Sequence, residues 1–215
     1  MGKKDLQHHL ILTITSVAVM VIPMDRGVFF GSVGDWHSQH VGAAEALRQT
    51  IVDSGALFPQ IINIGGGSNI YDLAYYGLFR PDIIISCIFP GIEMKYFIAS
   101  YSALGFIVSV NMMYIWLRNK GIEQNSCFIG GMFMAGAACF FHAHHHVMFV
   151  NYMPFLILAL IGIDRLIKKG RIDAAIAAVF FMVLHSFFMY RPVCWCVLYI
   201  FYMKFCMKMK KKEIN

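Results

Sequence analysis

Charged residues are scarce in this sequence. Aspartate, glutamate, lysine and arginine make up 14% of its 215 residues, whereas a typical soluble domain carries about 25%. Hydrophobic residues make up 59%, and the mean hydropathy is +0.62. One small core cannot bury so much apolar surface, so the sequence predicts an integral membrane protein whose solvent is the lipid bilayer.

Patterns typical of several other protein classes are missing. The six cysteines have neither the spacing of a secreted disulfide framework nor that of a zinc site, and we interpret them as small packing residues. The basic residues gather at the ends of apolar segments rather than on a face with interleaved aromatics, which argues against nucleic acid as a partner. The sequence shows no internal repeat, low-complexity linker or soluble domain.

Apolar segments predict an all-α integral membrane protein with about six transmembrane helices, all in a single membrane domain over residues 1–215. The predicted spans are 6–23, 94–117, 126–142, 146–163, 173–190 and 192–207. Because roughly 20 helical residues cross the hydrocarbon, the second span is amply long, and the third, fourth and sixth are marginal. The first span lacks a signal-peptide cleavage site and is interpreted as a retained anchor.

Basic clusters set the predicted orientation, because lysine and arginine favour the cytoplasmic side of a membrane. When the six spans alternate, all four clusters fall on one side: Lys3–Lys4, Arg118–Lys120, Arg165–Arg171 and Lys204–Lys212. Both termini are therefore predicted in the cytoplasm, with residues 208–215 as a basic tail. Residues 24–93 then form a long first extracytoplasmic loop, and a His-rich turn near 142–146 lies on the same face.

The long loop contains one amphipathic helix. Apolar residues recur at helical spacing at Val41, Ala44, Leu47 and Ile51, and Glu45, Arg48, Gln49 and Asp53 occupy the other sides. Gly55 is an expected stop. This helix is predicted to lie on the membrane surface with its apolar face toward the lipid. The apolar stretch 81–91 is too short to cross and is predicted to re-enter the membrane or to lie at its interface.

Polar side chains gather just before this helix, in the stretch GDWHSQH at residues 34–40. Asp35 is either the N-cap of the helix or a functional carboxylate, and spacing alone favours neither. His37 and His40 can share a helix face, but no third metal ligand is fixed by the sequence, so we interpret them as interfacial polar residues. The glycine-rich stretch at 62–69 lacks the Gly-Lys-Ser/Thr of a phosphate-binding loop and predicts a flexible loop.

The stretch HAHHH at residues 142–146 is the second concentration of polar chemistry. His142, His145 and His146 lie near one helical face. Three interpretations stay open for these histidines: a polar turn, a metal site, or a surface that contacts a phosphate.

The order of several stretches resembles a known family. GDWHSQH, DSGALF, NIGGGSN and YYGLFRPD resemble the first outer loop of the bacterial YfhO-type membrane proteins, and HHHVMFVNYMPFLILALIGIDRLIKKG resembles a later span and its cytoplasmic turn. The resemblance covers roughly residues 5–172 and fades beyond them. Since the proteins of that family are much longer, the resemblance indicates that this chain is an N-terminal portion of such a protein. If the chain is truncated, we expect it to be inactive alone.

What the resemblance implies is a glycosyltransferase of the GT-C superfamily. Such an enzyme transfers a sugar from a polyprenyl-phosphate donor to a cell-envelope polymer such as teichoic acid, at the extracytoplasmic face of the bacterial cytoplasmic membrane. Asp35 matches the acidic residue that serves these enzymes as candidate catalytic base. The implied substrate contacts are His37, Gln39, His40, Asn63, Asn69, His144, His145 and His146. No metal ligand is assigned, and the family leaves a divalent metal open as cofactor.

Two other functions stay open beside this one. The first alternative is a non-catalytic membrane module that binds a lipid-linked sugar or a partner subunit. A small transporter would carry ionisable residues inside its spans, where His185 is the main one here. Because the polar chemistry gathers at one face, the sequence favours surface chemistry on a lipid-linked substrate.

Overall fold

The computed structural model describes residues 2–21, 35–72, 77, 80–137, 151–185, 194–195 and 198–206, and most of these residues are helical. The elements in chain order are α1 (Lys3–Val21), η1 (Trp36–Val41), α2 (Gly42–Ser54), β1 (Ile61–Ile62), β2 (Ser68–Asn69), α3 (Pro81–Ser86), α4 (Met94–Asn119), α5 (Gln124–Ala135), α7 (Met153–Lys169) and α8 (Asp173–His185). Residues 198–206 are helical as well.

Helix α4 corresponds to the predicted span 94–117 and extends it by two residues. Its 26 residues, at about 1.5 Å each, reach roughly 39 Å, which exceeds the about 30 Å of bilayer hydrocarbon. Among the described residues it is the one helix long and apolar enough to cross a membrane. The remaining five crossings stay predictions, and parts of them (22–23, 138–142, 146–150, 186–193, 196–197 and 207) lie outside the described residues.

Two helices end at other residues than the predicted spans. Helix α5 ends at Ala135, and the predicted end at 142 lies outside the described residues. Helix α7 continues to Lys169, six residues beyond the predicted end at 163. The hydropathy falls at Asp164, but helical hydrogen bonding continues through charged residues until Gly170, whose positive φ of 69° closes the helix in the left-handed conformation.

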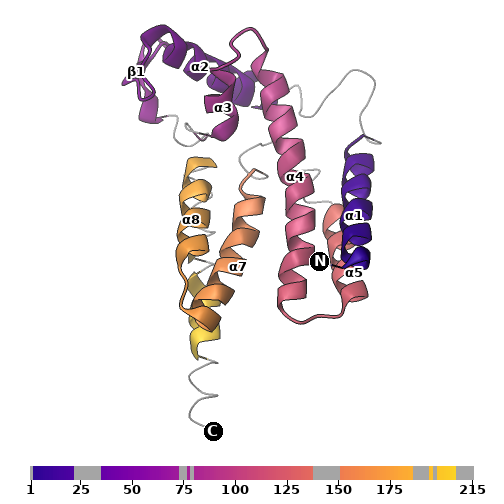
Figure 1. The fold of residues 1–215 in the computed structure, drawn as a ribbon. Coiled ribbons are helices and arrows are strands. Elements are labelled where there is room, and N and C mark those ends of the chain that lie inside the picture. Colours follow the sequence, from indigo (N-terminus) through magenta and orange to yellow (C-terminus); the bar gives the residue numbers. More distant parts are fainter. Residues whose placement is uncertain are drawn as a thin grey trace.

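The helices pack into a bundle around small and aromatic residues. Helices α1, α4 and α5 share an apolar cluster that includes Leu12, Phe106 and Cys127, and α7 packs on both α4 and α8 (Figure 1). The α7–α8 contact is close at Gly162, where an added Cβ would lie 2.6 Å from the backbone nitrogen of Ala175. Small residues permit this kind of close helix approach in membrane proteins.

The residues of the basic clusters that the structure describes lie together at one end of this bundle. The start of α1, the α4–α5 turn and the α7–α8 turn are all at the lower end in Figure 1. Lys120 and Lys204 both pair with Asp164, at 2.5 and 2.7 Å, and Arg118 lies 3.6 Å from Asp5. The sequence predicts that these clusters share one side of the membrane, and this arrangement agrees with that. Whether that side is cytoplasmic stays a prediction.

Helix α2, the strands β1 and β2, and α3 pack at the opposite end (Figure 1). Helix α2 ends at the predicted Gly55, which has a φ of 65°. The apolar residues of α2 recur at the predicted helical spacing and are buried. The predicted contact of this face with lipid is wrong. Leu47 and Ile51 pack in a protein core with residues of η1, the hairpin, α3 and α4. Protein and lipid are equally apolar, so the pattern alone could not separate them.

Arg48 departs from the predicted amphipathic pattern in the same helix. Its side chain is buried, although the sequence placed it on a polar side of α2. The guanidinium donates to the Ile92 carbonyl at 2.5 Å and to both carboxylate oxygens of Glu45 at 2.6 Å. A buried arginine is tolerated because its donors are satisfied.

The glycine-rich stretch forms a β-hairpin rather than a flexible loop. Strands β1 and β2 are antiparallel, with Ile61 opposite Asn69 and Ile62 opposite Ser68. Gly65, Gly66 and Gly67 have φ values of 63°, 87° and 108°, a region that residues with a side chain rarely adopt. Three consecutive glycines therefore make the tight reversal, which the sequence prediction of a loop did not foresee as a hairpin.

Candidate functional site

The stretch GDWHSQH leads into a π-helical turn, η1, whose two faces differ. Trp36 and His40 are buried, with 7% and 2% of their surface exposed, and Trp36 belongs to the apolar core of the loop. Asp35, His37 and Gln39 are exposed. The buried pair therefore anchors the turn and leaves these three polar side chains, together with Ser38, at its surface. Single π-helical turns are rare and frequently occur at functional sites.

The Asp35 carboxylate makes a side-chain contact in place of a helix cap. The backbone of Asp35 is already helical, with φ −57° and ψ −32°, and its side chain makes no capping hydrogen bond. Gln39 instead donates from Nε2 to Oδ1 of Asp35 at 2.8 Å. Of the two interpretations left open by spacing, the capping one is wrong, because an N-cap needs an extended backbone that turns its oxygen toward the next amides.

His37 and His40 do not share a face. The prediction assumed α-helical geometry, in which residues three apart are neighbours. The π-helical turn widens the hydrogen-bonded ring, so His37 is exposed while His40 is turned into the core. Within the residues that the structure describes, no group of three or more histidine, cysteine or acidic side chains could hold a metal ion.

The two asparagines predicted to bind sugar hydroxyls lie on the hairpin. Both Asn63 and Asn69 are exposed, and Asn69 accepts a hydrogen bond from the Tyr71 amide at 3.0 Å through Oδ1. The hairpin and the π-helical turn are joined through one apolar core, in which Trp36 packs with Ile62 and Ile70. The structure thus places Asn63, Asn69 and Asp35 in one folded unit.

The other predicted substrate contacts, His144, His145 and His146, lie outside the described residues. Their contact with phosphate stays a prediction.

Sequence reasoning missed a buried ion pair between Arg80 and Asp82. The Arg80 Nε and Nη2 donate to the two Asp82 carboxylate oxygens at 3.0 and 2.9 Å, and each side chain is 1% exposed. Pro81 lies between them and opens α3, with Arg80 in the extended conformation that a following proline imposes. The signal available in the sequence was an Arg-Pro-Asp triplet next to an apolar run.

His185 lies beside this pair and is held by two hydrogen bonds. Its Nδ1 is 2.6 Å from the Phe181 carbonyl, and its Nε2 is 2.7 Å from the Tyr101 hydroxyl. A carbonyl only accepts, so Nδ1 carries a proton and donates to Phe181, while Nε2 shares a hydrogen bond with the Tyr101 hydroxyl. The one mid-span ionisable group that the sequence offered to a transporter thus joins α4 to α8.

The pKa shifts outside the predicted spans reflect local contacts rather than a reactive centre. Hydrogen bonds from the Tyr114 hydroxyl and the Gly2 amide lower the pKa of Asp5 to about 2. In the outer loop, burial raises the pKa of the Cys87 thiol, although the nearby Arg48 charge opposes this. A buried thiol with a raised pKa is a poor nucleophile, so the exposed polar residues of η1 are the better candidate site.

A helical chain whose α4 is long and apolar enough to cross a membrane, with a polar turn on a folded loop, fits the class of helical membrane proteins. The family model described as "Bacterial membrane protein YfhO" matches residues 10–215, and the chain belongs to this family. No curated protein matches the chain, and no solved structure does either.

The family match corrects one expectation about the resemblance. It continues through α8 and residues 198–206 to the C-terminal residue, so the limit placed near residue 172 is wrong. Apolar residues of similar size replace one another in membrane helices without changing the helix. Similarity there is consequently hard to see in short motifs.

Proposed function

We propose that this chain acts in sugar transfer at the extracytoplasmic face of the bacterial cytoplasmic membrane. The donor is a sugar carried on polyprenyl phosphate, and the acceptor is a cell-envelope polymer such as teichoic acid. Membership of the YfhO membrane-protein family supports this proposal at the level of the membrane. The observation that carries it is the exposed Asp35 carboxylate, held beside Gln39 on a π-helical turn whose other face is anchored in the core.

The proposed orientation follows from charge. The basic clusters lie at the end of the bundle opposite to η1 and α2 (Figure 1), and such clusters favour the cytoplasmic side. With α4 across the membrane, the turn that carries Asp35 then faces the outside. A polyprenyl donor keeps its tail in the bilayer and presents its phosphosugar at that surface.

Asp35 serves as general base in the proposed reaction. The acceptor hydroxyl oxygen forms a bond to the anomeric carbon, its proton passes to the Asp35 carboxylate, and the bond from that carbon to the phosphate oxygen breaks with its electron pair leaving on the phosphate. Gln39 fixes the carboxylate through its 2.8 Å hydrogen bond. His37, exposed on the same turn, supplies a donor toward the leaving phosphate.

The test replaces Asp35 by Asn in cells that depend on this protein, followed by monosaccharide analysis of the purified envelope polymer. Loss of one sugar from the polymer, with unchanged amounts of the protein in the membrane, is the expected result. Asp53→Asn is the matched control, because Asp53 is another exposed carboxylate of the same folded loop. Normal sugar content with Asp35→Asn would remove the base from the mechanism and favour a non-catalytic binding module.

A further inference from the structure

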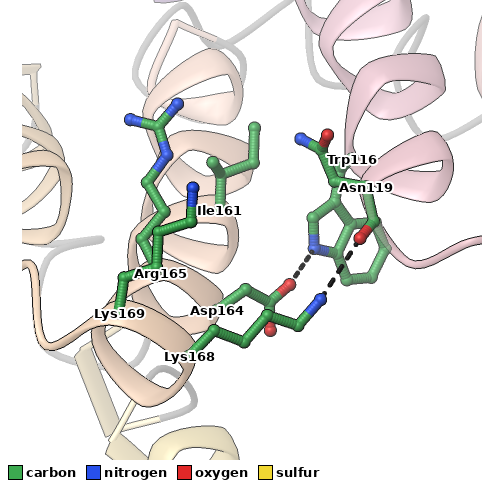
Figure 2. A pocket seen from close by; sticks show the side chains of 7 residues that line it. All are labelled: Trp116, Asn119, Ile161, Asp164, Arg165, Lys168 and Lys169. Carbon is green, nitrogen blue, oxygen red and sulfur yellow. Dashed lines mark hydrogen bonds between the residues drawn. The ribbon is translucent and has the colours of Figure 1, made fainter.

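A cavity of about 240 Å³ lies between the end of α4 and the last turns of α7, at the end of the bundle opposite to α2 (Figure 1). Figure 2 shows the side chains that line it: Trp116, Asn119, Ile161, Asp164, Arg165, Lys168 and Lys169. Three of the seven are cationic and one is anionic. The proposed sugar transfer makes no use of this cavity.

The single carboxylate of the cavity is already neutralised. Asp164 receives hydrogen bonds from Lys204 at 2.7 Å and from the Trp116 indole at 3.1 Å, and Lys120 pairs with it at 2.5 Å. Two lysines therefore compensate one aspartate. Asp164 has no negative charge left to balance the cations of α7.

Those cations lie at helical spacing and repel one another. Arg165 and Lys169 are four residues apart and exposed, and their charged ends extend from α7 in the same direction in Figure 2. In the part of the chain that the structure describes, no carboxylate pairs with either. Lys168 has one contact, to the Asn119 carbonyl at 3.3 Å. Like charges at this spacing destabilise a helix slightly, and a bound anion would reverse that effect.

The proposed orientation of α4 puts the cavity beside the lipid headgroups. With α4 across the membrane, its length exceeds the hydrocarbon thickness by roughly 9 Å, and the basic Arg118 and Lys120 at its end favour the headgroup layer for the last turn, with Trp116 and Asn119. A tryptophan there is typical of the membrane interface. Trp116 and Ile161 add an apolar wall beside the cationic groups, a combination suited to an amphiphile rather than to a fully hydrated ion.

We propose that this cavity binds the phosphate headgroup of an anionic phospholipid. Arg165 and Lys169 contact the phosphate, Lys168 contributes a further donor, and Trp116 with Ile161 packs against the glycerol and the first acyl carbons. Basic pockets between membrane helices bind anionic headgroups in this way. The site is separate from Asp35, so it stands whether or not the chain transfers sugar.

The test measures lipid binding by the purified full chain in detergent, with native mass spectrometry as readout and phosphatidylglycerol or phosphatidylcholine as added probe. We expect roughly tenfold stronger binding of phosphatidylglycerol, with most of the preference lost in Arg165→Gln/Lys169→Gln. The control Lys3→Gln/Arg171→Gln removes two charges at the same end but none from the cavity. It should change binding by less than about twofold, because both residues are exposed.

Each other result decides against the site. Equal losses in the cavity variant and the control would mean a diffuse surface charge effect. Equal binding of both lipids would exclude charge recognition. Displacement of phosphatidylglycerol by excess inorganic phosphate would identify a free-anion site in place of a lipid site. If the double variant fails to fold, as judged by its thermal unfolding, Arg165→Gln alone must still weaken binding by about threefold.

Discussion

Replacing Asp82 by Asn should strongly destabilise the fold, because it breaks a buried ion pair. Arg80 and Asp82 share two hydrogen bonds, of 3.0 and 2.9 Å, and each side chain is 1% exposed. The substitution keeps the size of the side chain and leaves the Arg80 charge buried without its carboxylate. Breaking such a pair costs about 3–5 kcal/mol of unfolding free energy.

A second acid–base pair provides the matched control. Glu93 and Lys95 are also two residues apart and lie 2.6 Å from each other, but their side chains are 65% and 39% exposed. Water and salt screen such a pair, so Glu93→Gln should cost less than about 1 kcal/mol. Each substitution removes one carboxylate from a pair whose members are two residues apart, and the two pairs differ in burial.

The assay is thermal unfolding of the purified chain in detergent, in a background in which the other five cysteines are replaced by Ala, followed by the reaction of a thiol dye with Cys127, which is fully buried in the fold. For a chain of this length, Asp82→Asn should lower Tm by on the order of 10 °C. The double variant Arg80→Met/Asp82→Leu should recover part of the loss, since it removes both charges. A Tm decrease no larger than that of Glu93→Gln would refute the reasoning.

Two further perturbations test the packing and the electrostatics of the described fold. Gly77→Ala should destabilise the chain far more than Gly55→Ala in the same thermal assay: both glycines have positive φ, but an added Cβ meets the His185 carbonyl only at residue 77, whereas nothing lies within 4 Å at residue 55. Equal losses of stability would show that backbone strain alone destabilises the residue 77 variant, by roughly 1 kcal/mol of unfolding free energy. Asp5 should make stability depend on acid, because Tyr114 holds its pKa at about 2, below the ordinary 3.8; its contribution is complete above pH 3.8 and is lost as pH falls toward 2. Asp5→Asn should flatten this dependence in unfolding curves measured across that range, and an unchanged curve would contradict the assignment.

Local features of the fold could be predicted because their causes are local. The periodicity of α2 and its stop at Gly55 follow from side-chain spacing and from the freedom of glycine at positive φ. The length and position of α4 follow from an uninterrupted apolar run. Boundaries that depend on hydrogen bonding rather than on hydropathy, such as the end of α7 at Lys169, were missed by several residues.

The roles of the candidate site residues stay predictions. Asp35 and Gln39 were named through the family resemblance as base and substrate contact, and the hydrogen bond that joins them was not foreseen. The pairing of His37 with His40 failed because a π-helical turn replaced the assumed α-helix. Arg80 and Asp82 were passed over, since a short polar triplet gives no sign that both side chains are buried.

The sequence by itself determined that the chain is helical and apolar, that its basic residues gather at the ends of its segments, and that a polar stretch precedes α2. The tertiary structure alone decided what covers each apolar face. Helix α2 packs on protein although its pattern suited lipid equally well, and His185 is satisfied by Tyr101, 84 residues away in the chain. Amphipathic spacing records that a face avoids water, and only the packing of distant segments determines which apolar partner covers it.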